Sequence, residues 1–210
     1  LSTKNPRKMP LIRIDEVSTE TKLALWYMEE SDQELLVRYP YMAQSLENMR
    51  SRTRRQERLC ACALLEAVTG DRQPIVHHNA KGKPFLTSGS ISISHTRNFL
   101  AMLYCQKPDQ RLGIDIEWMN NRVERITDYF MRHDEFAPSL TDKLLNWSAK
   151  ETCYKFFSEQ GLKYSEMKVE HNGQNQLEVM NLKNNEKLSV KFLVEDKYLL
   201  TWADMCNISY

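Results

Sequence analysis

Two long amphipathic segments, each ending at a glycine, constrain the fold of this chain more than any other feature. The segments are RRQERLCACALLEAVTG, residues 54–70, and DKLLNWSAKETCYKFFSEQG, residues 142–161. Each reads as a helix, and glycine commonly follows the last turn of a helix because it adopts the left-handed conformation there. Each predicted helix comes before a pair of predicted strands around a turn, at residues 91–105 and 188–206.

The same order of elements occurs twice along the chain. A strand and a helical segment precede each long helix, at residues 21–30 and 31–40 in the first series and at 111–119 and 123–137 in the second. Ser31 and Glu34 predict a capping box at the start of the first helical segment. The two series are offset by about 90 to 100 residues, which is typical of a structural repeat. We therefore expect an α/β (α+β) fold, a pseudo-twofold repeat of two similar α/β halves with a ligand cleft between them. Each half has a small sheet and a long helix, and the halves, residues 1–106 and 107–210, form one functional unit.

Composition and charge exclude some classes of partner. Of the 210 residues, 41% are hydrophobic and 27% are charged, which is ordinary for a globular protein. The formal net charge is only +1, which argues against attraction to nucleic acid or to an acidic membrane. No apolar run approaches the roughly 20 residues needed to span a bilayer. The stretch LSTKNPRKMP also lacks the apolar core of a signal peptide. We expect no nucleic-acid partner and no membrane association.

The cysteines indicate a reducing compartment. There are five, an odd number, and no CxxC pair occurs among Cys60, Cys62, Cys105, Cys153 and Cys206. This pattern does not favour a disulfide framework. We therefore expect a reduced, cytoplasmic protein.

Two acidic motifs are candidates for a metal site. In GIDIE, residues 113–117, Asp115 and Glu117 point to the same face of a strand, a spacing that suits a hard divalent ion such as Mg²⁺. The alternative is a solvated outer face of the sheet. In WSAKETCYK, residues 147–155, Glu151 is a candidate third carboxylate and Lys155 a candidate phosphate ligand. Here the alternative is a surface ion pair between residues four apart on a helix.

Three further stretches could bind anions. Ser94 and His95, in SISHT, could hold a phosphate or form half of a hydrolytic pair, although no G-x-S-x-G motif supports a serine hydrolase. RSRTRRQER, residues 50–58, has five arginines near a helix N-terminus, where backbone donors also attract anions. The loop sequence GKP adds Lys83. The ordinary glycine-rich nucleotide-binding motifs do not occur.

Four stretches of this sequence closely resemble the motifs of the 4′-phosphopantetheinyl transferase superfamily. In chain order they are GKP, SISHT, GIDIE and WSAKETCYK. The hallmarks of that superfamily are a G-[IV]-D-x-E strand and a later [FW]-[SAC]-x-K-E-[SAT]-x-x-K helix. YFMRHDEF, residues 129–136, looks like its aromatic-rich helix. The length resembles that of the monomeric, two-half class that activates nonribosomal peptide and polyketide synthases. Cys62 and Thr96 depart from the pattern, since many members have arginine and serine there.

The resemblance implies an enzyme that moves the 4′-phosphopantetheine arm of coenzyme A to a serine of an apo acyl or peptidyl carrier protein. The other product is adenosine 3′,5′-bisphosphate. The expected cofactor is Mg²⁺, with Mn²⁺ as the alternative, and coenzyme A is a co-substrate. By similarity, Asp115, Glu117 and Glu151 hold the metal, Glu151 is also the general base, and Lys155 holds a pyrophosphate oxygen.

The resemblance also assigns the coenzyme A contacts and the acceptor. By similarity, phosphate contacts come from Ser94 and His95, adenosine contacts from Lys83, and the 3′-phosphate contact from Arg52, Arg54 or Arg55. The acceptor would present an acidic helix, and residues 159–169 are a candidate contact for it. Two alternative functions stay open: a Mg²⁺-dependent hydrolase that cleaves the coenzyme A pyrophosphate, and an inactive coenzyme A-binding module.

Overall fold

The first long helix, α3, lies where the sequence predicts it. The computed structural model describes residues 10–173, 175–205 and 208–209. Helix α3, Arg52–Thr69, begins after Ser51, whose hydroxyl accepts a hydrogen bond from the backbone amide of Arg54. It ends at Gly70, which has a φ of 76° in the left-handed region. A glycine therefore ends the helix, as predicted, and a serine cap that was not predicted begins it.

The N-terminal half contains a four-stranded antiparallel sheet. Its strands, in the order in which they pair, are β1 (Leu11–Glu16), β2 (Thr21–Tyr27), β6 (Phe99–Cys105) and β5 (Ser90–Thr96). The predicted turn at Arg97 and Asn98 joins β5 to β6, and Arg97 has a φ of 46°. A two-stranded sheet of β3 (His77–His78) and β4 (Pro84–Phe85) lies in the loop before β5.

Short helices complete this half beside α3. Helix α1, Asp32–Arg38, has the predicted capping box between Ser31 and Glu34. A 3₁₀ turn, η1 (Pro40–Met42), and a helix of one turn, α2 (Ala43–Leu46), follow it. Apolar side chains of these helices and of α3 pack on one face of the sheet.

The C-terminal half contains a larger antiparallel sheet. Its strands, in pairing order, are β7 (Gly113–Trp118), β11 (Tyr198–Ala203), β10 (Glu186–Val194), β9 (Gln176–Asn181) and β8 (Met167–His171), and β12 (Ile208–Ser209) also pairs with β10. The second long helix, α5 (Leu140–Phe156), packs on this sheet through a second core. The strands β8 and β9 are additions that the predicted repeat does not contain.

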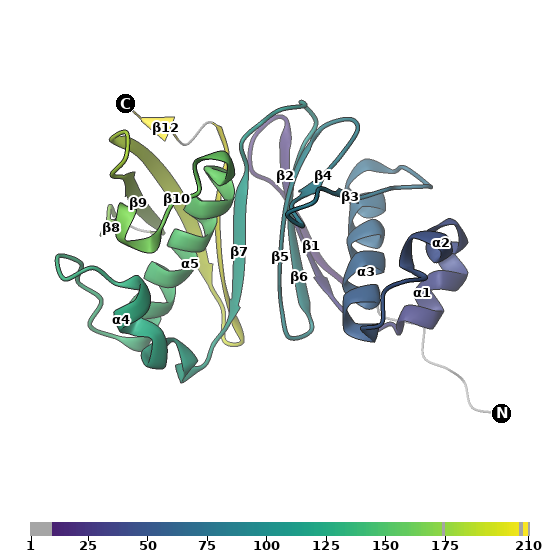
Figure 1. Cartoon of the computed structure of the whole chain (residues 1–210), viewed down its shortest axis with the longest axis horizontal. Coiled ribbons are helices and arrows are strands. Elements are labelled where there is room, and N and C mark those ends of the chain that lie inside the picture. The colour runs from purple at the N-terminus through teal and green to yellow at the C-terminus, as the bar shows by residue number, and fades with distance from the viewer. Residues whose placement is uncertain (1–9, 174, 206–207, 210) are drawn as a thin grey trace.

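The two sheets pack face to face between the two long helices. A third core lies between them and joins Leu23 and Leu103 of the first sheet to Ile114 and Leu200 of the second. Figure 1 shows the resulting order of layers, with α3 outside one sheet and α5 outside the other. Across the described part of the chain the fold is therefore α+β, with helices on the outer faces of antiparallel sheets.

Two helix predictions in the second half were wrong in extent. Residues 123–137 contain only a 3₁₀ turn, η2 (Asn121–Ile126), and a helix of one turn, α4 (Thr127–Phe130). Beyond α4 the chain leaves the helix and turns at residues 133–134, where the Glu135 carboxylate accepts from the Arg132 amide and enters a buried ion pair. Helix α5 ends at Phe156 rather than at Gly161, which instead ends the 3₁₀ turn η3 (Ser158–Gln160).

Two composition-based predictions bear on the described residues. Cys60, Cys62, Cys105 and Cys153 are buried and free, while Cys206 lies outside the described residues. Burial raises the pKa of the Cys62 thiol to about 11, which suits a small core residue rather than a reactive one. Among the described residues there is no helix with the length and apolarity to cross a membrane.

Helix α5 approaches its sheet closely at Gly113. A Cβ added to Gly113 would lie 2.2 Å from the backbone carbonyl oxygen of Thr152. Only a residue without a side chain fits there, which gives a packing reason for the glycine that opens GIDIE. The contact brings β7 close enough for its next side chains to reach α5.

Replacing Gly113 with alanine should destabilise the fold. We expect Gly113→Ala to lower the free energy of unfolding by about 1–3 kcal/mol, because the new methyl group meets backbone that cannot rotate away. Urea unfolding followed by circular dichroism measures the change. The double variant Gly113→Ala, Thr152→Ser should be no more stable, since the clash is with the main chain. Equal stability of Gly113→Ala and the wild type would contradict this account.

Candidate functional site

The predicted acidic residues meet where the edges of the two sheets adjoin. Asp115 and Glu117 lie on β7, the edge strand of the second sheet, and Glu151 and Lys155 lie on α5, which packs over it. Ser94 comes from β5, the edge strand of the first sheet. The two edge strands lie next to each other in Figure 1. Residues from both halves of the chain therefore form one cluster.

Asp115 is the buried centre of the cluster. One of its oxygens, Oδ1, accepts from the Ser94 hydroxyl and from Lys155 Nζ, each at 2.8 Å. The other, Oδ2, accepts from the Ser148 hydroxyl at 2.8 Å. Three donors thus compensate the cost of burying this carboxylate.

In the described part of the chain, the carboxylate of Glu117 has fewer hydrogen-bond donors than that of Asp115. Trp147 donates its indole N–H to Glu117 Oε1 at 2.6 Å, with the ring partly buried against α4. Burial, followed by repulsion from Asp115, raises the pKa of Glu117 from 4.5 to about 7. The indole hydrogen bond opposes this rise but does not cancel it. The second carboxylate oxygen has no hydrogen-bond partner among the described residues.

Glu151 has a matching arrangement. The hydroxyl of Tyr164, which lies in the 3₁₀ turn η4 (Tyr164–Glu166), donates to Glu151 Oε1. Burial raises the pKa of Glu151, and the charge of Asp115 raises it further. The bond from Tyr164 and the charge of Lys155 act in the opposite direction. Each glutamate is therefore held by one aromatic donor.

Lys155 turns toward the strand rather than toward Glu151. Its ammonium group donates to the Ile114 carbonyl and to Asp115 Oδ1, each at 2.8 Å. Its side chain is only 26% exposed. Among the described residues no ion pair joins Lys155 to Glu151, so the alternative of a surface pair between them is wrong for this structure.

The donor chemistry of the cluster fits a hard divalent cation. Asp115 and Glu117 share one face of β7, and Mg²⁺ takes one or two carboxylates together with waters and phosphate oxygens. Three carboxylates surround a single lysine, and their mutual repulsion contributes to the raised pKa values. Within the described residues no three His, Cys, Asp or Glu side chains converge as a metal site. One oxygen of Glu117 and one of Glu151 each accept a hydrogen bond, from Trp147 and Tyr164 respectively.

A cavity of about 570 Å³ opens beside the cluster. Its walls come from the Asn79–Pro84 loop, strand β5, and the last turns of α5. Lys155 and Lys83 both line it, and Lys83 Nζ lies 2.6 Å from the Ser158 hydroxyl and 3.3 Å from Glu159 Oε1. Lys81 also lines the cavity, so three lysines face it, which suits a phosphate-bearing ligand.

His95 lies at the other side of β5, against the N-terminal part of α3. Its Nδ1 atom is 3.4 Å from Glu57 Oε1, and half of its side chain is exposed. Ser94, its neighbour, points instead to Asp115. Adjacent residues on a strand face opposite ways, so these two do not share one set of contacts.

The three candidate arginines have different surroundings. Arg55 donates to Asp32 Oδ2 at 2.8 Å and to the Met49 carbonyl at 3.0 Å, so it holds α1 against α3. Arg52 approaches Asp32 at 3.9 Å, and its side chain is 70% exposed. The Arg54 side chain is exposed and makes no hydrogen bond or ion pair within the described residues.

Three functional contacts were not predicted from the sequence. Ser148 lies inside the WSAKETCYK motif, but nothing in its spacing shows that it reaches Asp115. Trp147 was predicted only as a core anchor, and it also donates to Glu117. Tyr164 lies in the stretch predicted to contact a carrier protein, and its hydroxyl donates to Glu151. Buried donors of this kind leave no periodic signal in a sequence.

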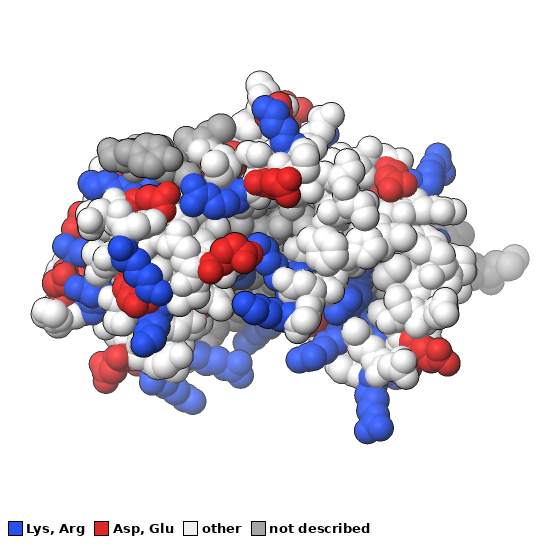
Figure 2. Space-filling model, turned by 45° about the horizontal axis from the view of Figure 1, so that its top comes forward, with Lys and Arg blue, Asp and Glu red and all other residues white. Residues whose placement is uncertain are grey.

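The surface carries charges of both signs. Figure 2 shows acidic and basic side chains interspersed on one face of the molecule, with neither sign covering it. This agrees with the formal net charge of +1.

Comparison with models of protein families found none that matches the chain, and comparison with curated proteins found no matching sequence.

The raised pKa of Glu117 makes the stability of the metal-free protein depend on pH. Between pH 4.5 and 7 the folded state binds a proton at Glu117 more tightly than the unfolded chain does, so stability falls as the pH rises through this window. Glu117→Gln removes this pH-dependent fall in stability, because glutamine does not titrate. Relative to the wild type, the variant should gain up to about 3 kcal/mol of unfolding free energy across the window.

Denaturant unfolding with a chelator, over a series of pH values, measures this gain. Glu29→Gln, at an exposed position, is the matched control and should follow the wild type at every pH. A constant difference between Glu117→Gln and the wild type from pH 4.5 to 7 would show that Glu117 does not titrate there.

Proposed function

We propose that this protein transfers the 4′-phosphopantetheine arm of coenzyme A to a serine of an apo acyl or peptidyl carrier protein. The observation that carries the proposal is the meeting of Asp115, Glu117, Glu151 and Lys155 beside a cavity of about 570 Å³ lined by two further lysines. The reaction is attack by a hydroxyl oxygen on a pyrophosphate. It needs a cation site, a proton acceptor, and positively charged groups that face the leaving phosphate.

The arrangement of the chain supports a two-half enzyme. Each half, residues 1–106 and 107–210, supplies a sheet with a long helix on its outer face. We propose that the halves are related by a pseudo-twofold repeat and that the ligand lies between them. Ser94 and Lys83 would then act from one half, and Asp115 and Lys155 from the other.

Asp115, Glu117 and Glu151 are the proposed Mg²⁺ ligands, with Mn²⁺ as the alternative. When bound, the metal supplies positive charge that offsets the charge developing on the pyrophosphate. The excess of carboxylates over lysine supports this assignment. Lys155, which lines the cavity, would bind a pyrophosphate oxygen, and Glu151 would accept the proton of the acceptor serine.

Coenzyme A would be held from both sides of β5. Lys83 lines the cavity and would lie along the adenosine. His95 and Ser94 are the proposed phosphate contacts. Of the three candidate arginines we assign the 3′-phosphate to Arg54, because it lies one turn before Glu57, the partner of His95, and Arg55 is engaged with Asp32.

Incubation with coenzyme A, Mg²⁺ and an apo carrier protein tests the proposal. The expected outcome is a carrier that gains the mass of one phosphopantetheine arm, with release of adenosine 3′,5′-bisphosphate. Free phosphopantetheine with an unmodified carrier would indicate a hydrolase instead. Binding of coenzyme A without any product would indicate an inactive binding module. A panel of acyl and peptidyl carriers would identify the preferred acceptor.

Replacing Glu151 by glutamine should abolish transfer without unfolding the protein. We expect Glu151→Gln to lower kcat at least about 10²–10⁴-fold, because the amide cannot accept the serine proton. Its thermal unfolding should stay close to that of the wild type. Glu170→Gln, on the exposed part of β8, is the matched control and should retain full activity. Near-normal turnover by Glu151→Gln would exclude Glu151 as base and as ligand.

A further inference from the structure

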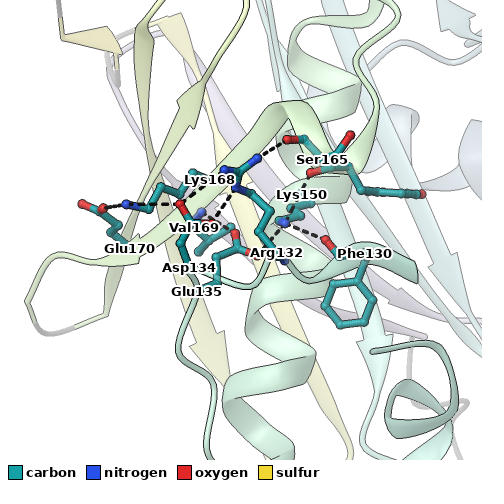
Figure 3. Close-up of polar contacts among 10 residues, drawn as sticks. Phe130, Arg132, Asp134, Glu135, Lys150, Ser165, Lys168, Val169 and Glu170 are labelled. Atoms are coloured by element: carbon teal, nitrogen blue, oxygen red, sulfur yellow. Dashed lines mark hydrogen bonds and ion pairs between the residues drawn. The ribbon is translucent and has the colours of Figure 1, made fainter. Parts of the chain in front are cut away.

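A fully buried ion pair lies under the candidate site. The side chains of Lys150 and Glu135 are both 0% exposed, and Lys150 Nζ lies 2.8 Å from Glu135 Oε2. The same ammonium donates to the Phe130 carbonyl at 2.7 Å and to the Tyr164 carbonyl at 3.4 Å. Figure 3 shows Lys150 among these partners.

Glu135, the acidic partner of Lys150, also has hydrogen-bond donors to both of its carboxylate oxygens. Glu135 Oε2 accepts from the Arg132 amide and Oε1 from the Val169 amide, each at 2.7 Å. Burying two charges is costly unless every donor and acceptor is used. Here the pair fastens α5 to the end of α4, to the turn that follows it, and to β8. Arg132 adds a bond to the Ser165 carbonyl next to Tyr164.

Tyr164 is the residue through which this anchor reaches the site. Lys150 holds its backbone carbonyl, while its hydroxyl donates to Glu151, the residue next to Lys150 in sequence. Its ring contacts Trp147 and Tyr129, with centroid distances of 5.2 and 5.3 Å. Both ends of Tyr164 are therefore fixed by hydrogen bonds, and its ring is fixed by neighbouring rings.

Trp147 and Tyr164 together keep the two glutamates in place. Trp147 donates to Glu117 and Tyr164 to Glu151, and the two donor rings are in contact with each other. Each donor occupies one carboxylate oxygen and leaves the other oxygen available within the described residues. Rigid donors of this kind commonly orient the ligands of a metal site.

We propose that Tyr164 is a positioning residue for Glu151, held in place by the buried Lys150–Glu135 pair. Its hydroxyl keeps one oxygen of Glu151 fixed, so that the other oxygen faces the metal and the acceptor serine. The effect on catalysis rests on the proposed function. The orientation of Glu151 by Tyr164 does not, and it can be measured separately.

Tyr164→Phe is the test, because it removes the hydroxyl and retains both ring contacts. We expect kcat for transfer to fall about 10–100-fold, with the KM for coenzyme A unchanged. Mg²⁺ affinity, measured by calorimetry, should fall by a similar factor. Tyr129→Phe is the matched control and should behave as the wild type. Its hydroxyl forms no hydrogen bond within the described residues, and 71% of that residue is exposed.

A second measurement keeps the inference independent of the activity. The free energies of unfolding of Tyr164→Phe, Glu151→Gln and the double variant form a cycle, and non-additive values show that the two groups interact. If the unfolding free energies are non-additive but the wild type transfers nothing, the orientation of Glu151 by Tyr164 stands and the proposed function is rejected. Additive values would overturn the inference. So would non-additive values with an unchanged kcat in an active enzyme, because Tyr164 would then be only structural.

Discussion

The close contact between β7 and α5 is the constraint on which the site depends. Gly113 lets the strand approach the backbone of Thr152, and small polar side chains fill the space that remains. The hydroxyls of Ser148 and Thr152 both reach Thr201 on the neighbouring strand, at 2.8 and 2.6 Å. Larger side chains at these positions would push the helix outward and separate Asp115 from its donors on α5.

The chemistry of the site follows from an imbalance of charge in a partly buried place. Three carboxylates face one lysine, and the other donors to them are neutral hydroxyl and indole groups. Neutral donors orient a carboxylate without removing its charge. The arrangement thus keeps the carboxylates in position and still favours the arrival of a cation, a property that the proposed reaction requires.

Local sequence signals predicted the local structure well. The capping box at Ser31, the glycine after α3 and the turn at Arg97 were all confirmed, because each depends on a few adjacent residues. The helix predicted at residues 123–137 was wrong, since a long-range pair between Glu135 and Lys150 overrides the local pattern. The site was predictable as far as its acidic motifs. Contacts such as Tyr164 with Glu151 arise only when distant segments pack, so the sequence carries no direct sign of them.

The cavity has a further property, because one of its walls is β5, a strand that ends a sheet. An edge strand has backbone groups that no neighbour pairs, and such edges can recruit another chain as an added strand. On β7 the Lys155 ammonium already covers one of these groups, the Ile114 carbonyl. A ligand seated in the cavity would cover part of the β5 edge in a similar way. Binding would then reduce the unpaired backbone that the protein offers to another chain.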